Sequence, residues 1–301
     1  MRPPYPVIDA HVHIMPWEQV RPDAAARMAA GRENIETIRA ITRDPHRLIA
    51  FMDERGIEKL VMINYLSPDV VGFTEEANTF SAGMARAYPE RLIPFGGIDP
   101  RRVKDVAAEM DRLLGDPSTL PPSGVAGRGL GIRGIKIHPP HQLFRANAYL
   151  HDPELRGLAT VYEKCIEYDA PVMVHTGTSV FPRARNKYGD PMDLDDVIVD
   201  FPDLKLIVAH GGRPLWMNTA LFLLRRSQNV YLDVSSIPPK NLLHYFPWIE
   251  RVASQAMFGS DWPGPDVKDP LQNIEDFYGL PISAQAKRQI LRETAERIFA
   301  R

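Results

Sequence analysis

The sequence predicts a (β/α)₈ barrel. Short apolar stretches alternate with segments of helical pattern along the 301 residues, as in a parallel sheet covered by helices on both faces. The length suits one such barrel, because α/β barrels commonly run to roughly 200–250 residues or more as one domain. A doubly wound open sheet is the competing architecture, but no Gly-x-Gly-x-x-Gly segment or P-loop favours it. We therefore expect residues 1–301 to form a single barrel domain.

The predicted strands are short runs dominated by Val, Ile, Leu and Met, which is typical of strands buried on both faces. In chain order they comprise residues 7–14, 59–64, 91–98, 134–138, 171–175, 205–210, 230–234 and 255–260.

The predicted helices are bounded by residues that favour helix ends. Asp44-Pro45 opens a helix that Gly56 ends, and Asp152-Pro153 precedes another over 154–168. Residues 20–42 predict an extended helical excursion after the first strand, and residues 116–131, rich in Pro, Gly and Ser, predict a loop or insertion. The other predicted helices comprise residues 75–87, 103–114, 193–200, 214–226, 240–252, 270–278 and 283–300.

The composition argues against several classes of partner. The net charge is −2, and Lys and Arg are spread along the chain, so we expect neither a nucleic-acid nor a membrane partner. The single cysteine, Cys165, excludes an intrachain disulfide and fits a reducing compartment. The first residues lack the apolar segment of a signal peptide, and no apolar run is long enough to span a bilayer. We expect a cytoplasmic protein with a small-molecule substrate, and leave homo-oligomerisation open.

Imidazole and carboxylate side chains stand at the carboxyl ends of several predicted strands, where barrels carry their catalytic groups. His11 and His13 end the first strand on one face, because alternate side chains of a strand point the same way. His175, His210 and Asp261 follow the fifth, sixth and eighth strands. These histidines could simply form hydrogen bonds, but a buried carboxylate is costly unless a cation or strong donors meet it. The pattern favours a site for zinc or a similar divalent ion.

These motifs resemble those of the amidohydrolase superfamily, and most closely the branch that includes aminocarboxymuconate-semialdehyde decarboxylase. The motifs are His11-Val12-His13, His175, Ala209-His210-Gly211-Gly212, Gly259-Ser260-Asp261 and the closing residues 293–299.

The resemblance implies one divalent metal ion, zinc with manganese as the alternative, held by His11, His13, His175 and Asp261. It also implies that His210 is a base or polarising group beside the metal-bound water. Such a metal lowers the pKa of bound water from about 15.7 towards 7. Asp261 could accept a proton from that water, so we assign catalytic roles to both His210 and Asp261.

Lys136, in the fourth strand, leaves two alternatives open. In other amidohydrolases a lysine of this strand is carbamylated and bridges two metal ions, whereas the decarboxylase branch is mononuclear. We favour an unmodified Lys136 that binds a substrate anion or hydrogen-bonds carboxylates, with His138 lining the pocket. Asp233 is expected to orient other site residues rather than bind metal.

Substrate-binding residues are predicted in the loops around the barrel mouth. Arg183, Arg185 and Arg213 could clamp a carboxylate, although such charges are often only solvated. Trp262 could form a wall against a planar substrate, with packing of its loop onto the barrel as the equal alternative.

The sequence therefore predicts a hydrolase in which metal-activated water attacks a small carboxylated ester, lactone or amide. The alternative is non-oxidative decarboxylation of an aromatic or unsaturated carboxylic acid at the same metal. Hydrolysis comes first because decarboxylation additionally needs a carboxylate clamp. A non-catalytic barrel with a structural metal is the third hypothesis, and it leaves His210 without a function.

Overall fold

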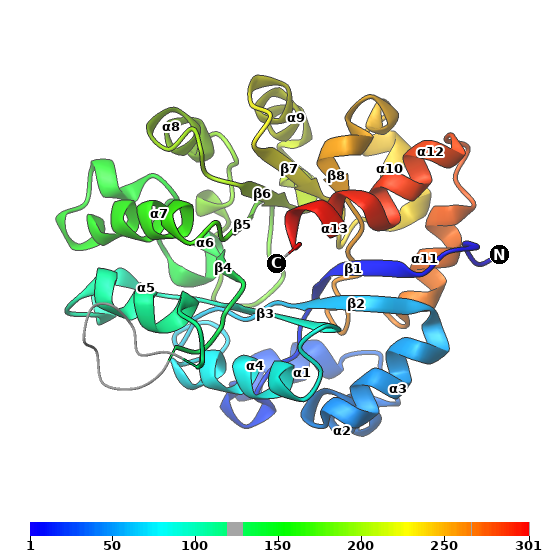
Figure 1. Cartoon of the computed structure of the whole chain (residues 1–301), viewed down its shortest axis with the longest axis horizontal. Coiled ribbons are helices and arrows are strands. Elements are labelled where there is room, and N and C mark those ends of the chain that lie inside the picture. Colours follow the sequence, from blue (N-terminus) through cyan, green and yellow to red (C-terminus); the bar gives the residue numbers. More distant parts are fainter. Residues whose placement is uncertain (119–128, 266, 301) are drawn as a thin grey trace.

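The predicted barrel is confirmed by the computed structural model, which describes residues 1–118, 129–265 and 267–300. Eight parallel strands pair in sequence order, β1 beside β2 and onward to β8, and helices surround them (Figure 1). The strands are β1 (Val7–Val12), β2 (Ile57–Met62), β3 (Leu92–Gly96), β4 (Gly134–Ile137), β5 (Val172–His175), β6 (Leu206–Ala209), β7 (Val230–Asp233) and β8 (Ala256–Met257).

The barrel closes where β8 and the residues after it meet β1. The amide of Ala10 donates to the carbonyl of Phe258 at 2.9 Å, and the amide of Asp261 donates to the carbonyl of His11 at 2.8 Å. Val12 and Trp262 form a parallel bridge just beyond. Closure therefore brings Asp261 beside His11, although 250 residues separate them in the sequence.

Most helices match their predicted positions. They are α1 (Pro22–Ala29), α2 (Ile35–Arg43), α3 (Pro45–Arg55), α4 (Glu76–Ala87), α5 (Val106–Leu114), α6 (Pro139–Gln142), α7 (Gly157–Glu167), α8 (Asp193–Asp200), α9 (Met217–Arg226), α10 (Pro239–Tyr245), α11 (Pro270–Tyr278), α12 (Ala284–Arg288) and α13 (Thr294–Ile298). The carboxylate of Asp44 accepts from the amides of His46 and Arg47, and Gly56 ends α3 in the left-handed conformation.

Several predicted helices are interrupted. The helix expected over 240–252 divides into α10 and a 3₁₀ segment, η7 (Ile249–Gln255). The excursion over 20–42 divides into α1 and α2 around Gly31, whose φ of 70° is unfavourable for residues with a side chain. The closing segment contains a π-helical turn, η8 (Gln289–Glu293), between α12 and α13. The predicted loop at 116–131 lies largely outside the described residues.

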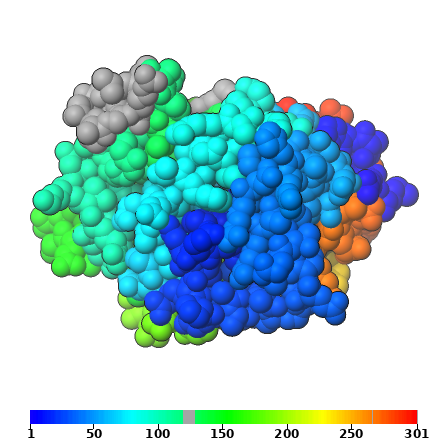
Figure 2. Space-filling model, turned by 90° about the horizontal axis from the view of Figure 1, so that it is seen from below, coloured from blue at the N-terminus to red at the C-terminus, as the bar shows by residue number. Residues whose placement is uncertain are grey.

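The strands and the inner faces of the helices form one core of buried apolar side chains. On the face in Figure 2, the blue residues of the excursion pack directly against the cyan residues of the following units. Among the described helices, none combines the length and apolarity needed to cross a bilayer.

Candidate active site

The ends of β1 and β8 bring two imidazoles and a carboxylate together. Oδ1 of Asp261 lies 3.1 Å from Nε2 of His13 and 3.5 Å from Nε2 of His11. Ligand atoms of all three side chains lie within 4.8 Å of one another, close enough for one metal ion. The structure therefore brings together three of the four predicted ligands.

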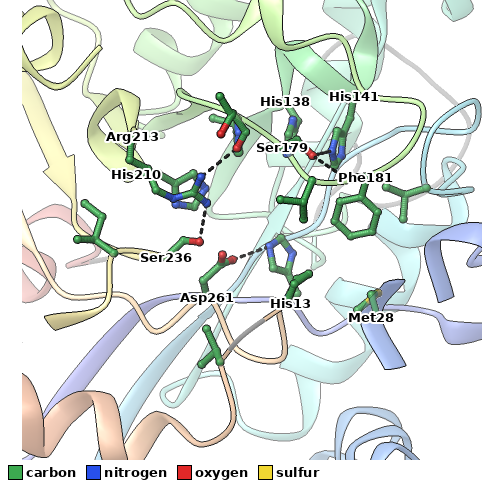
Figure 3. A pocket seen from close by; sticks show the side chains of 18 of the residues that line it. His13, Met28, His138, His141, Ser179, Phe181, His210, Arg213, Ser236 and Asp261 are labelled. Atoms are coloured by element: carbon green, nitrogen blue, oxygen red, sulfur yellow. Dashed lines mark hydrogen bonds and ion pairs between the residues drawn. The ribbon is translucent and has the colours of Figure 1, made fainter. Parts of the chain in front are cut away.

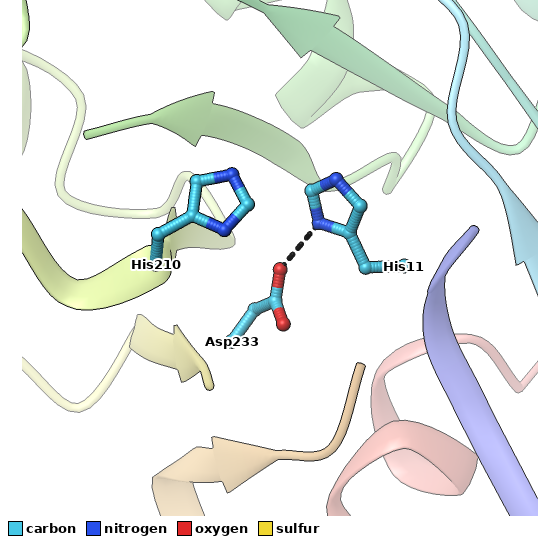
Figure 4. A group of neighbouring side chains, drawn as sticks. All are labelled: His11, His210 and Asp233. Atoms are coloured by element: carbon cyan, nitrogen blue, oxygen red, sulfur yellow. Dashed lines mark hydrogen bonds and ion pairs between the residues drawn. The ribbon is translucent and has the colours of Figure 1, made fainter. Parts of the chain in front are cut away.

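His11 is held in place by Asp233, at the end of β7 (Figure 4). Nδ1 of His11 lies 2.5 Å from Oδ2 of Asp233, which also accepts from the hydroxyl of Ser235 at 2.8 Å. Oδ1 of Asp233 accepts from the amide of Ser235 at 2.8 Å. Because these bonds occupy the carboxylate, Asp233 suits the orienting role expected of it, and Nε2 of His11 is left for an ion.

The fourth predicted ligand, His175, lies beside this cluster. Its ring centroid is 4.6 Å from that of His210, and its Nε2 is buried with no hydrogen-bond partner among the described residues. Nε2 of His11 is likewise buried and unpartnered within the described part of the chain. Buried polar atoms normally have partners, so these two nitrogens fit a site for a divalent ion.

Burial governs the protonation of the site. It lowers the pKa values of His11, His175 and His210, so these imidazoles are neutral and able to bind metal or accept a proton. Burial alone would raise the pKa of Asp261. The hydrogen bond with His13 and the electrostatic interactions with the His11 and His13 rings and with Arg213 outweigh it, so the pKa is lowered and the group is a carboxylate.

His210 follows β6 and faces the loop after β7. Its Nδ1 lies 3.1 Å from the carbonyl oxygen of Ser235 and 2.9 Å from the hydroxyl of the same residue. A carbonyl oxygen can only accept, so Nδ1 carries the proton and Nε2 is a free acceptor. The ring centroid of His210 is 4.9 Å from that of His11, so His210 lies beside the candidate metal ligands His11, His13 and Asp261.

The loop after β4 adds a second group of rings. His138 stacks between His141, at a centroid distance of 3.6 Å, and His175, at 3.8 Å. The hydroxyl of Tyr65 lies 2.9 Å from Nδ1 of His141, and the hydroxyl of Ser179 lies 2.7 Å from Nε2 of the same ring. The sequence analysis missed Tyr65 and Ser179. The only sequence feature that points to them is their position three or four residues beyond a strand end, which many loop residues share.

The site opens into a cavity of about 410 Å³. His13, Asp261, His210, His138 and His141 lie around it in Figure 3, with the dashed line between His13 and Asp261 at its floor. The apolar part of the wall includes Met28, Val71, Phe73, Phe181 and Ile237. The cavity has the size, shape and mixed lining of a small-molecule site.

The predicted arginine clamp is reduced to one residue. Arg213 lines the cavity, with Nη1 donating to the carbonyl of Thr178 at 2.9 Å and Nη2 donating to the hydroxyl of Ser236 at 2.5 Å. Arg183 instead donates to Asp23 at 2.9 Å. Of the Arg and Lys residues that the structure describes, only Arg213 lines the cavity, so Arg183 and Arg185 do not take the positions we expected.

Two further substrate-binding predictions are also corrected. Trp262 is 1% exposed and stacks on Phe51 of α3 at a centroid distance of 4.5 Å, so it packs the loop onto the barrel. Lys136 is fully buried and does not line the cavity, and burial lowers its pKa to about 8. Within residues 1–118, 129–265 and 267–300, its Nζ has no hydrogen-bond partner. His138, by contrast, lines the cavity as predicted.

Fold and site together define a (β/α)₈ barrel with an enzyme-like cluster of imidazoles and a carboxylate at the carboxyl ends of its strands. The family model for amidohydrolases matches residues 8–301, and the chain belongs to this family. The predicted resemblance to the amidohydrolase superfamily is thereby confirmed, and so is the prediction of an enzyme.

Solved structures share the fold at low sequence identity. An uncharacterised TIM-barrel protein from Bordetella bronchiseptica is 24% identical, with a TM-score of 0.72 and 98% of each chain covered. The 5-carboxyvanillate decarboxylase of Novosphingobium aromaticivorans, in complex with manganese and a nitrobenzoic acid, is 18% identical, with a TM-score of 0.63 over 98% of this chain and 96% of that one. A probable 2-pyrone-4,6-dicarboxylic acid hydrolase from Acinetobacter baumannii, with citric acid bound, is 16% identical, with a TM-score of 0.64 over 98% and 99%. No curated protein sequence matches the chain.

Proposed function

We propose that the chain is a metal-dependent hydrolase of a small carboxylated ester, lactone or amide. The observation that carries this proposal is the orientation of His210. Its Nδ1 lies 3.1 Å from the carbonyl oxygen of Ser235, which leaves Nε2 unprotonated next to the metal cluster. A neutral imidazole with a free acceptor is a general base for water, and hydrolysis requires one.

His11, His13 and Asp261 would hold the divalent ion, and His175 would complete the set. We expect zinc, with manganese as the alternative, because imidazole and carboxylate ligands suit both ions. When bound, the ion supplies a Lewis acid and lowers the pKa of water at the site towards neutrality.

The remaining roles belong to groups that line the cavity. Nε2 of His210 accepts the proton of the attacking water, and Arg213 binds the carboxylate of the substrate. Thr178 and Ser236 fix the guanidinium, so less conformational freedom is lost when the carboxylate binds. The apolar wall around Phe73 and Phe181 limits the water that surrounds the reacting carbonyl.

The test is the substitution His210→Asn. We expect metal content to stay at the wild-type value while kcat for the best substrate of an ester and lactone screen falls by about 10²–10⁴-fold, as expected for loss of a general base. His175→Ala serves as the contrast, because it should lower metal content as well as kcat. Wild-type activity in His210→Asn would refute the role of His210.

Decarboxylation is a second candidate, and the lining of the cavity favours it. Met28, Phe73 and Phe181 form an apolar wall suited to an aromatic ring, and Arg213 supplies a cation for a carboxylate. Release of carbon dioxide from aromatic or unsaturated acids, without consumption of water, would select this reaction. Elemental analysis decides the state of Lys136, since a carbamylated lysine predicts two metal ions per chain and an unmodified one predicts a single ion.

A further inference from the structure

Tyr65, His141 and Ser179 form a hydrogen-bonded chain that the proposed hydrolysis has not used. The hydroxyl of Tyr65 is 2.9 Å from Nδ1 of His141, and Nε2 of His141 is 2.7 Å from the hydroxyl of Ser179. All three residues line the active-site cavity, and Figure 3 shows the last of these contacts. Tyr65 and Ser179 come from the loops after β2 and β5, and His141 comes from the short helix α6 after β4.

The chain runs from the metal cluster towards the mouth of the cavity. Tyr65 is 3% exposed, and its ring centroid lies 6.2 Å from that of His13. Ser179 at the other end is half-buried, and the next residue, Val180, is 55% exposed. Solvent therefore reaches one end of the chain, and the other end stands next to the reacting groups.

Each member can both donate and accept a hydrogen bond. If Nδ1 of His141 carries the proton, it donates to the oxygen of Tyr65, while Nε2 accepts from the hydroxyl of Ser179. The phenolic proton of Tyr65 is then directed away from His141 and is available to a group in the cavity. Hydrolysis creates the need for such a donor, because the leaving oxygen or nitrogen departs with an electron pair and must gain a proton.

We propose that Tyr65 is the general acid of the reaction and that His141, hydrogen-bonded to Ser179, holds the Tyr65 hydroxyl so that its proton faces the cavity. The inference rests on the proposed hydrolytic function. His210 takes a proton from the attacking water as the new carbon–oxygen bond forms. When the bond to the leaving group breaks, Tyr65 gives its proton to the leaving atom. Tyr65 regains a proton from water that enters the cavity as the product leaves, and His141 keeps its proton on Nδ1. His210 returns its proton to solvent, so the cycle consumes one water molecule and no net proton.

The first test compares leaving groups in Tyr65→Phe. The substrates are monomethyl terephthalate and mono(4-nitrophenyl) terephthalate, which share the acyl part but differ in the need for protonation of the leaving oxygen. We expect kcat to fall by about 10²–10⁴-fold for the methyl ester and by less than about 10-fold for the nitrophenyl ester. Equal losses on both esters would overturn the assignment of Tyr65, because a structural defect does not distinguish leaving groups.

The matched control is Tyr88→Phe. The hydroxyl of Tyr88 also pairs with a histidine, at 2.6 Å from Nδ1 of His46, but this pair lies far from the cavity on the outer helices. We expect wild-type rates on both esters. If the metal-loaded wild-type enzyme hydrolyses neither ester, the proposed substrate class fails. That outcome differs from equal losses on both esters in Tyr65→Phe, which would overturn only the role of Tyr65.

A second test needs no turnover. In metal-loaded protein labelled with ¹⁵N at histidine, His141 should appear as a neutral imidazole protonated at Nδ1, and its Nδ1 resonance should shift in Tyr65→Phe. A proton on Nε2 would mean that Tyr65 donates to His141 and has no proton for the leaving group. That result would overturn the proposal even if both esters prove to be poor substrates.

Discussion

Three residues beside the cavity adopt a left-handed backbone that residues other than glycine rarely adopt. His210, Ser236 and Asp261 have φ values of 64°, 57° and 64° and follow β6, β7 and β8. Each such residue costs on the order of 1–3 kcal/mol, and such residues gather at functional sites. At these positions the chain leaves the strand abruptly while the side chain stays at the cavity. The site is therefore built at the expense of local stability.

At the same scale, the contact between Asp233 and His11 yields a prediction about metal affinity. The carboxylate lies 2.5 Å from Nδ1 of His11 and so sets the direction of Nε2. We expect Asp233→Asn to weaken metal binding by about 10–100-fold, as for other residues that orient metal ligands. Competition with a chelator, followed by metal analysis, measures this change.

Asp200→Asn is the matched control for this substitution. Asp200 accepts a hydrogen bond of 2.6 Å from Tyr149 at the surface, so its loss should leave metal affinity unchanged. Equal affinities in wild type and Asp233→Asn would show that Asp233 does not support the ligand.

At the scale of elements, the excursion formed by α1 and α2 links the loops around the cavity. Met28 of α1 lines the cavity, and Asp23 of α1 binds Arg183 in the loop after β5. Beyond α1, Nη2 of Arg32 lies 3.1, 2.5 and 2.7 Å from the carbonyl oxygens of Pro263, Gly264 and Val267. These carbonyls belong to the loop that begins with Asp261. The excursion therefore supports the loop that carries this predicted metal ligand.

The substitution Arg32→Met tests this support. We expect faster amide hydrogen exchange at Trp262, Gly264 and Val267 and a KM several-fold higher, because charged hydrogen bonds worth about 1.5–3 kcal/mol are lost from the loop. Arg47→Met, which removes an exposed i,i+3 pair with Asp44 on α3, should change neither quantity. Unaltered exchange at Trp262, Gly264 and Val267 would show that the loop keeps its conformation without Arg32.

At the scale of the whole molecule, the last helical segment ties the ends of the chain to the barrel. Figure 1 shows α13 lying across the barrel beside β1 and β8, while α12 lies among the outer helices. Nη1 of Arg292, in η8, donates to Glu58 of β2 at 2.5 Å and to the carbonyl of Pro6 at 3.0 Å. The hydrogen bond from Arg292 lowers the pKa of Glu58 below its ordinary value of 4.5.

We expect Arg292→Met to lower the free energy of unfolding by about 1 kcal/mol at pH 7, since the pair is only partly buried. A carboxyl group whose pKa is lower in the folded state than in the unfolded state stabilises the fold at pH values above its unfolded-state pKa, which is near 4.5. This stabilisation is lost as the pH falls through the pKa of Glu58 in the folded state. The difference between wild type and variant should therefore shrink under acid conditions.

Urea unfolding at pH 7 and at pH 3 measures this difference. Arg288→Met, which removes an exposed pair with Glu293, provides the control and should show a smaller effect at pH 7. A difference for Arg292→Met that is unchanged at pH 3 would contradict the contribution from Glu58.

The sequence alone determined the barrel and most of the candidate metal site. Strand periodicity places His11 and His13 on one face, and parallel strands bring their carboxyl ends to one end of the barrel. His210 and Asp261 could therefore be predicted as neighbours of these residues without knowledge of any loop. Asp233 was expected to orient other site residues, and the structure supplies the contact with His11 through which it does so.

Only the tertiary structure decided which loop residues belong to the cavity. Arg213 enters it while Arg183 pairs with Asp23, and Trp262 turns away onto Phe51. Tyr65, His141 and Ser179 meet although each follows a different strand. The physical reason is that strand periodicity constrains direction only inside the sheet. Beyond a strand end, the path of the backbone depends on packing and hydrogen bonds with segments distant in the sequence.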